Sequence, residues 1–176
     1  FSRPRASGII AVELLPGDRL IGVKLTDGQQ NIMLFSDAGK AVRFHEEQVR
    51  AMGRTARGVR GMKLRHDEKV IALIVPAEAG AILTATENGY GKRSDISDYR
   101  PSGRGGLGVI SIQVTERNGK VVGAILALDA DEIMLITDQG TLVRTRSAEI
   151  SVIGRNTQGV RLINLSGEEK LSGIAR

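Results

Sequence analysis

The chain has 176 residues, of which 41% are apolar and only 3% aromatic, and it contains no cysteine. This composition predicts a folded chain with an aliphatic core, and it excludes disulfides and thiolate metal sites. Basic residues exceed acidic ones by five, with a pI near 9.9, which is compatible with an anionic partner. No apolar run reaches the ~20 residues needed to span a bilayer, and no secretory leader is visible at Phe1. We therefore expect a cytoplasmic chain with no membrane partner.

A glycine followed by Ile or Val recurs about every fifty residues along the chain. It is found at Gly8, Gly58, Gly108 and Gly159. In the six residues after each glycine, mostly apolar side chains alternate with mostly polar or small ones, which is the pattern of a half-buried strand. The sequence therefore predicts strands at 9–14, 59–64, 109–114 and 160–165.

The rest of each unit also repeats in a fixed order. A second apolar run predicts strands at 20–25, 70–75, 121–126 and 171–174. Continuous aliphatic segments, typical of strands buried on both faces, follow at 32–36, 82–86 and 133–137. Each of these ends in a turn whose glycine, at Gly39, Gly89 or Gly140, we expect to have a positive φ and to close a hairpin. A helical turn fits in Glu46–Met52.

Four short strands per unit, at this period, predict an all-β fold of the propeller or β-pinwheel type. The units are expected at approximately 8–57, 58–107 and 108–158, with a partial unit at 159–176. A β-sandwich would not explain the period. Because closed rings need about four to eight blades, we interpret the chain as an incomplete array of four-stranded blades.

Two glycine-rich segments invite a nucleotide-binding interpretation and fail it. Gly103, Gly105 and Gly108 match G-x-G-x-x-G, but that loop needs a helix after it, whereas a strand is expected from residue 109. The segment GYGKRS at 89–94 lacks the preceding glycine of a Walker A loop, and Arg93 interrupts its GK[ST] end. We therefore expect no bound nucleotide or other cofactor.

Arginines recur in register as well. Arg54, Arg104 and Arg155 each follow a glycine, and Arg43, Arg93 and Arg144 each lie in the strand after a hairpin. A solvated surface explains any single arginine, but repetition in register predicts a basic band along one rim. Few aromatic side chains are available to stack on single-stranded bases, so the band favours duplex phosphates. The candidate DNA contacts are Arg43, Arg54, Arg57, Arg93, Arg104, Arg144, Arg146 and Arg155.

No catalytic constellation stands out. His45 and His66 have no metal-ligand spacing around them and are interpreted as surface residues. The acidic pairs Glu46-Glu47 and Asp131-Glu132 are poor acid/base partners, because adjacent strand residues point to opposite faces. We therefore expect no active site and no metal in this chain.

Long segments of the chain resemble the C-terminal domain of DNA gyrase A, and the resemblance extends over all of it. The segments are IMLFSDAGKAVRF (32–44), ILTATENGYGKR (82–93), IMLITDQGTLVRTR (133–146) and GRNTQGV (154–160). This resemblance implies a β-pinwheel whose blades exchange strands and whose basic rim wraps duplex DNA, supporting ATP-dependent negative supercoiling. It implies partnership with the rest of gyrase A and with gyrase B in an A2B2 complex, where ATP and Mg²⁺ act outside this chain.

The chain also departs from that family. The family's Gln-Arg-Arg-Gly-Gly-Lys-Gly box is absent, and its nearest counterpart is 104–108, with Leu107 in place of the lysine. The family's cleaving tyrosine lies in another region, so Tyr90 and Tyr99 inherit no catalytic role, and Tyr90 is interpreted as structural. Two alternatives stay open: the related C-terminal domain of topoisomerase IV, and a propeller-like protein-interaction module.

Overall fold

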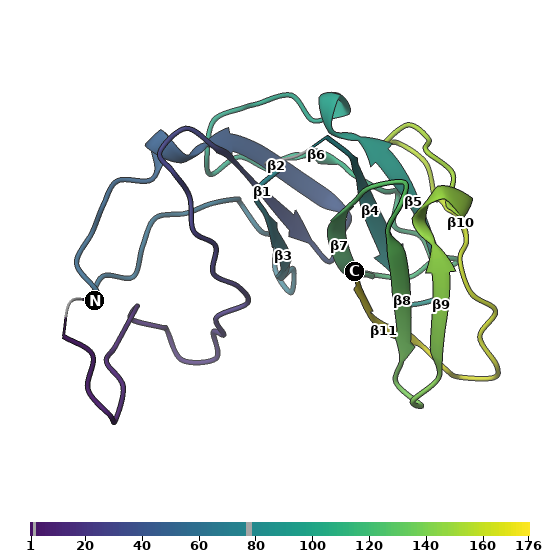
Figure 1. Cartoon of the computed structure of the whole chain (residues 1–176), viewed down its shortest axis with the longest axis horizontal. Helices are drawn as coiled ribbons and strands as arrows, with labels where there is room; N and C mark the ends of the chain where they lie inside the picture. Colours follow the sequence, from purple (N-terminus) through teal and green to yellow (C-terminus); the bar gives the residue numbers. More distant parts are fainter. Residues whose placement is uncertain (2, 77–78) are drawn as a thin grey trace.

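Three small antiparallel sheets follow one another along an arc (Figure 1). The structure, a computed structural model, describes residues 1, 3–76 and 79–176. Within these residues the only helical elements are 3₁₀ turns, so the predicted all-β class is confirmed. None of the described helices is long and apolar enough to cross a membrane.

Each sheet is built around one hairpin, with its partner strands on either side. The first sheet has the order β3 (Val70–Ile74), β1 (Asn31–Ser36), β2 (Lys40–His45), β6 (Val109–Ile110). The second has the order β7 (Val121–Ala127), β4 (Ala81–Thr86), β5 (Tyr90–Asp95), β10 (Val160–Arg161). The third has the order β11 (Leu171–Ala175), β8 (Glu132–Thr137), β9 (Leu142–Arg146).

The sheets exchange strands along the chain. The first hairpin, β1–β2, receives β3 on one edge and the much later β6 on the other, where Lys40 and Ala41 pair with Ile110 and Val109. β4–β5 receives β7 and β10 in the same way. The strands of one sheet therefore come from different sequence units, which confirms the exchange of strands implied by the family resemblance. The first two hairpins each have both edges paired by later segments, and in the described residues the third has only its β8 edge paired, by β11.

The hairpin turns agree with the sequence analysis. Gly39, Gly89 and Gly140 have φ values of 76°, 80° and 87°, a region in which glycine is the least strained residue. A 3₁₀ turn follows each hairpin, at η1 (Glu46–Gln48), η2 (Ile96–Asp98) and η3 (Ser147–Glu149). The helical turn expected within Glu46–Met52 is thus confirmed as η1, shorter than the segment allowed.

Several predicted strands are shorter than expected or irregular. Residues 9–14, 20–25 and 59–64 form no strand, and only Val109–Ile110 and Val160–Arg161 are extended in the segments at 109–114 and 160–165. The equivalents that do form strands pair with hairpins lying earlier in the chain. Among the described residues no such hairpin precedes residues 9–25. Their apolar side chains consequently stay exposed, and Leu25 is 96% accessible.

The core lies between the sheets rather than within one of them. Strand β4 is buried along its whole length, as predicted, because the second sheet has a neighbour on each face. Ile82 packs toward the first sheet with Met33 and Phe35, whereas Leu83 packs toward the third with Leu135. Strand β8 differs from the prediction because it is exposed at alternate positions: the third sheet is covered on one face only.

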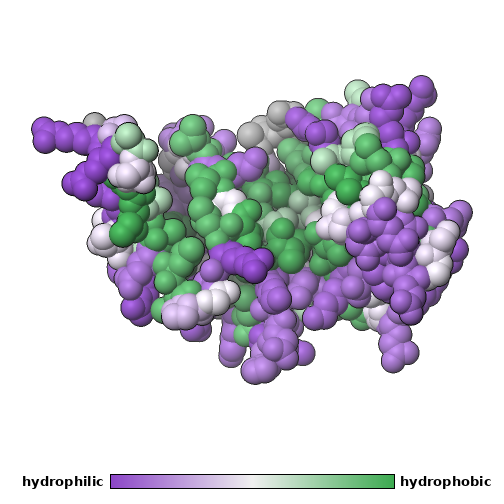
Figure 2. Space-filling model, turned by 90° about the horizontal axis from the view of Figure 1, so that it is seen from below, coloured by the Kyte–Doolittle hydropathy of each residue, from purple (hydrophilic) through white to green (hydrophobic). Residues whose placement is uncertain are grey.

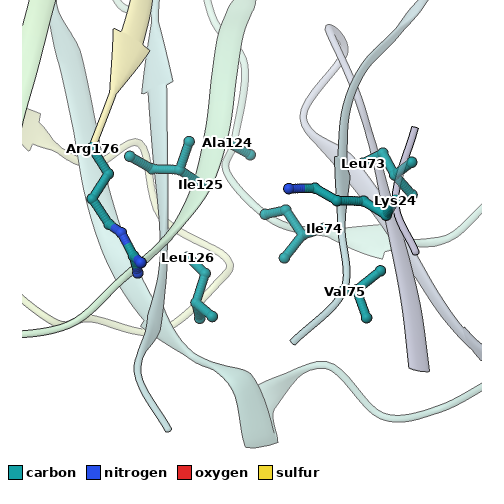
Figure 3. Close-up of a pocket in the computed structure, with 8 residues that line it drawn as sticks. All are labelled: Lys24, Leu73, Ile74, Val75, Ala124, Ile125, Leu126 and Arg176. Atoms are coloured by element: carbon teal, nitrogen blue, oxygen red, sulfur yellow. The ribbon is translucent and has the colours of Figure 1, made fainter. Parts of the chain in front are cut away.

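Seen from below, apolar side chains gather over the middle of the molecule, and hydrophilic ones predominate along the lower and right-hand borders (Figure 2). A cavity of about 340 Å³ lies between the inner strands β3 and β7, and Lys24 and Arg176 line it from opposite sides (Figure 3). The strands at the other end of each sheet order, β6 and β10, are the outermost. Each blade therefore has an inner, mainly apolar end and an outer end.

Candidate nucleic-acid interface

The three arginines that follow a loop glycine make the same contact in every unit. The Nη1 of Arg54 donates to the carbonyl of Ile10 at 2.7 Å, that of Arg104 to Arg60 at 2.5 Å, and that of Arg155 to Ile110 at 2.6 Å. Each acceptor is the second residue after a repeat glycine. Each arginine is therefore anchored to the start of its own unit. An arginine has five N–H donors, so each keeps donors for an anion.

These loops lie at the outer ends of the blades. The loop holding Arg104 runs directly into β6, and the loop holding Arg155 leads into β10. A hollow of about 400 Å³ beside Arg155 is also lined by Arg100, and one of about 610 Å³ beside Arg54 includes Arg3 and Arg5. Arg3, Arg5 and Arg100 are not among the contacts predicted from the sequence. Basic side chains thus gather at equivalent places in the repeat.

The arginines in the second hairpin strands serve another purpose. Arg93 is buried, with 5% of its surface exposed; its Nε donates to the carbonyl of Ile150 at 2.8 Å, and its Nη1 contacts Asp129 and the Ser147 hydroxyl. With its guanidinium bonded inside the protein, Arg93 is not presented to a phosphate in this structure, and its side chain joins the second sheet to the turn after the third hairpin. Its role as a DNA contact stays a prediction.

Arg43 occupies the equivalent place one sheet earlier. Its Nη1 donates to the carbonyls of Ile96 and Tyr99, both at 3.1 Å, and its Nε is buried with no hydrogen-bond partner among the described residues. Arg43 therefore also joins consecutive blades, and it is half-buried. We expect at most a minor contribution from it to any external contact.

The remaining predicted arginines are exposed. Arg144 is in register with Arg43 and Arg93, but among the described residues its only ion pair is with Glu132, at 3.3 Å, and 66% of its side chain is accessible. Arg57 pairs with Glu13 at 3.0 Å, and Arg146 lies exposed at the end of β9. Exposed ion pairs contribute about 0–1 kcal/mol, so these side chains can exchange a carboxylate for a phosphate at little cost.

The structure also brings together residues that the sequence analysis did not connect. Arg117 and Arg161 both lie over the ring of Tyr90, which was interpreted as structural. Arg117 and Arg161 are far apart in the sequence, and no other unit repeats their combination with a tyrosine. Repetition at matching positions therefore gives no signal for them. Their pairing depends on β10 lying beside β5.

The glycine-rich loop at 103–108 leads into a strand, as predicted from the sequence. Gly108 is followed by β6 rather than by a helix, and the amide of Gly105 is already bonded to the carbonyl of Gly61 at 2.7 Å. The side chains of His45 and His66 are 35% and 95% accessible. Within the described ranges no group of three or more His, Cys, Asp or Glu side chains is placed to hold a metal ion.

Comparisons with known proteins show which family has this architecture. The family described as "DNA gyrase C-terminal domain, beta-propeller" matches residues 1–27, 30–77, 81–127 and 131–176. The chain is 62% identical over 176 residues to DNA gyrase A of Salmonella typhimurium and 57% identical to that of Escherichia coli K12. All of the chain is covered in both alignments, and it spans about 20% of each relative's length.

Solved structures agree. A gyrase A C-terminal domain superposes with a TM-score of 0.87 at 28% identity, covering 96% of this chain and 57% of that one. The C-terminal domain of a DNA topoisomerase IV superposes with a TM-score of 0.92 at 23% identity, covering 99% and 55%, and shows the shared fold alone. With three strand-exchanged sheets, an arginine–glycine loop in each unit and a family match along almost its whole length, this chain belongs to the DNA gyrase C-terminal domain family.

Proposed function

We propose that this chain binds duplex DNA through backbone phosphates, without reading bases, and bends it around the outer ends of its blades. The observation that carries the proposal is the recurrence of Arg54, Arg104 and Arg155 in loops that, for the last two, lead into the outermost strands. Membership of the gyrase C-terminal domain family supports it. In the parent enzyme this bending supports negative supercoiling driven by ATP.

The anchoring of these arginines suits such a role. Smoothly bending a short duplex by 40–90° costs about 1–6 kcal/mol, which spaced phosphate contacts offset through counterion release. A guanidinium already fixed by a backbone carbonyl loses less conformational entropy when it meets a phosphate. The blades therefore present positive charge at fixed spacing along an arc, and the duplex is expected to follow that arc.

The aromatic residues favour duplex over single-stranded DNA. Single strands are bound by stacking bases on exposed rings. Phe35, Phe44, Tyr90 and Tyr99 are buried, and only Phe1 is exposed. Stacking platforms are thus scarce, whereas phosphate contacts are plentiful, and binding is expected to be insensitive to sequence.

The wider assembly is also a proposal, since the chain spans about a fifth of its relatives. We place the DNA-cleaving chemistry in the rest of gyrase A and the ATP and Mg²⁺ sites elsewhere in an A2B2 complex with gyrase B. The complex would act on the chromosome in the cytoplasm. Topoisomerase IV is the less favoured parent, because identity to gyrase A proteins reaches 62% while the topoisomerase IV likeness is one of fold.

A salt titration of duplex binding tests the proposal. With about two arginines engaged per unit, we expect log K to fall against log salt with a slope of about −4 to −6. A variant with Arg54→Gln, Arg104→Gln and Arg155→Gln removes three charges, and its shorter amides do not reach the carbonyls that Nη1 contacts. Because the contacts of Arg54 and Arg104 are exposed, water can replace these donors, so circular dichroism should be unchanged while binding weakens evenly across unrelated sequences. A slope near zero, or a loss confined to one sequence, would contradict binding through phosphates.

A further inference from the structure

Two guanidinium groups share one aromatic ring in the second blade. Tyr90 begins β5, and its ring is buried. The guanidinium carbon of Arg117 lies 4.8 Å from the ring centroid and that of Arg161 lies 5.3 Å from it. The Nη2 of Arg161 also donates a hydrogen bond of 2.7 Å to the Tyr90 hydroxyl. The ring therefore fixes two cations in one place.

The neighbouring contacts hold these cations without neutralising them. Among the described residues neither Arg117 nor Arg161 forms an ion pair with a carboxylate. Asn88 donates to the backbone carbonyl of Arg117 at 3.1 Å, which fixes that turn, and accepts from the Nζ of Lys170 at 2.5 Å. Two guanidinium groups thus share one ring at this hairpin end, where their mutual repulsion favours binding of an anion.

The geometry suits a phosphate in particular. Arg161 already donates from Nη1 to the Asn164 amide oxygen at 3.2 Å and from Nη2 to the Tyr90 hydroxyl at 2.7 Å. A phosphate would therefore be bound by the remaining N–H groups of Arg161 and by the planar fork of Arg117, whose geometry matches phosphate oxygens. Because the Tyr90 hydroxyl accepts a bond from Arg161, its own proton remains available to donate. Hydrogen bonding by Arg117 and then by Arg161 lowers the pKa of the Tyr90 phenol.

We propose that Tyr90, Arg117 and Arg161 form a site for one backbone phosphate of duplex DNA. This inference rests on the proposed function. Arg161 lies in β10, the outermost strand of its sheet, so the site is at the end of the blade that carries the arginine–glycine loops. In the other two hairpins Lys40 and Thr141 replace the tyrosine, so the site occurs once and anchors the duplex at the middle blade.

The test compares two double variants of the 176-residue chain with equal loss of charge. Arg117→Gln with Arg161→Gln removes the site, and Lys24→Gln with Arg176→Gln removes two cations beside the inner cavity (Figure 3). Binding of a fluorescent duplex is followed by anisotropy against salt. For the first variant, the slope of log K against log salt should become less steep by about 0.9, which corresponds to one phosphate contact. This variant should also bind about eightfold more weakly at 0.1 M salt. The second variant should match the unaltered chain.

Tyrosine absorbance provides a second readout that does not depend on DNA. The chain has two tyrosines and no tryptophan, and burial raises the pKa of Tyr99, so the lower-pH phenolate transition belongs to Tyr90. Inorganic phosphate should move that transition to higher pH in the unaltered chain but not in the Arg117/Arg161 variant.

The two readouts separate failure of the site from failure of the proposed function. If the unaltered chain binds duplex steeply but both variants behave alike, the site is overturned and the proposed function stands. If phosphate shifts the Tyr90 transition while duplex fails to bind, the cluster is a site for free anions, and the DNA assignment is overturned.

Discussion

Lys92 is a buried amine at the centre of the second sheet. Its side chain has no accessible surface, and its Nζ donates to the Ser94 hydroxyl at 2.5 Å. Burial, reinforced by the positive charge of Arg155 and opposed by Asp98, lowers the pKa of Lys92 from its ordinary 10.5 to about 8. Val42 occupies the same position in the first sheet. An apolar side chain is therefore compatible with this site.

The pKa gives the size and sign of the effect on stability. Lowering a pKa from 10.5 to about 8 corresponds to about 3 kcal/mol of cost when the amine is charged. Between pH 8 and 10.5 the unfolded chain binds more protons than the folded one, so stability rises with pH in this window. Lys92→Met removes that cost and one hydrogen bond worth about 1 kcal/mol, leaving about 2 kcal/mol of stabilisation at pH 7.

Urea unfolding of both chains from pH 7 to pH 10.5 measures this difference. Other titrating groups are common to the two chains and cancel. The advantage of Lys92→Met should shrink by about 3 kcal/mol across the range and reverse slightly at its upper end. A difference that stays constant with pH, or a variant that is less stable at pH 7, would refute the assignment of Lys92 as a buried amine with a lowered pKa.

Three further predictions concern the junctions between blades and the repeat glycines. Arg93→Gln should lower the free energy of unfolding by about 2–4 kcal/mol because it leaves the Ile150 carbonyl and the Ser147 hydroxyl without their buried partner. Arg144→Gln at the exposed equivalent should change it by less than about 0.5 kcal/mol, and equal effects in urea unfolding would contradict the junction. Gly58→Ala, at a φ of 85° with open space around it, should cost about 1 kcal/mol. Gly159→Ala should cost about 1–3 kcal/mol more than Gly58→Ala, because its new Cβ would lie 2.7 Å from the carbonyl oxygen of Gly91 in β5. Equal melting temperatures of the two variants would contradict this close approach.

The local elements of the fold could be predicted from the sequence because short-range patterns determine them. A glycine three residues after an aliphatic run specifies a hairpin, and Gly39, Gly89 and Gly140 close one each. The second apolar run of each unit also located the inner strands β3 and β7. These signals act within a few residues, so repetition along the chain strengthened them.

The partners of the outer strands could not be predicted in the same way. A period-2 pattern indicates which face of a strand is buried but not which edge it joins. The segment at 109–114 has the same pattern as that at 9–14, yet only the former has a hairpin beside it. Strand exchange therefore depends on distant segments, and the residue pattern alone left it open.

Repetition of arginines identified important positions but not their roles. A junction between blades and a site for a repeating ligand both require the same residue in each unit. Arg93 proved to be a junction and Arg155 an anchored loop residue, although both recur with equal regularity. The Tyr90 cluster shows the opposite case: it occurs once, so no regularity points to it.

The most direct test of the account is the end-to-end distance of a duplex bound to this chain. A duplex well below the ~150-bp persistence length, labelled at both ends, stays nearly straight in solution. Energy transfer between the labels should rise when the chain binds at low salt, and it should fall back in the Arg54/Arg104/Arg155 glutamine variant and on adding salt. Binding that leaves the transfer unchanged would show that the duplex remains straight, and it would contradict bending around the outer ends of the blades.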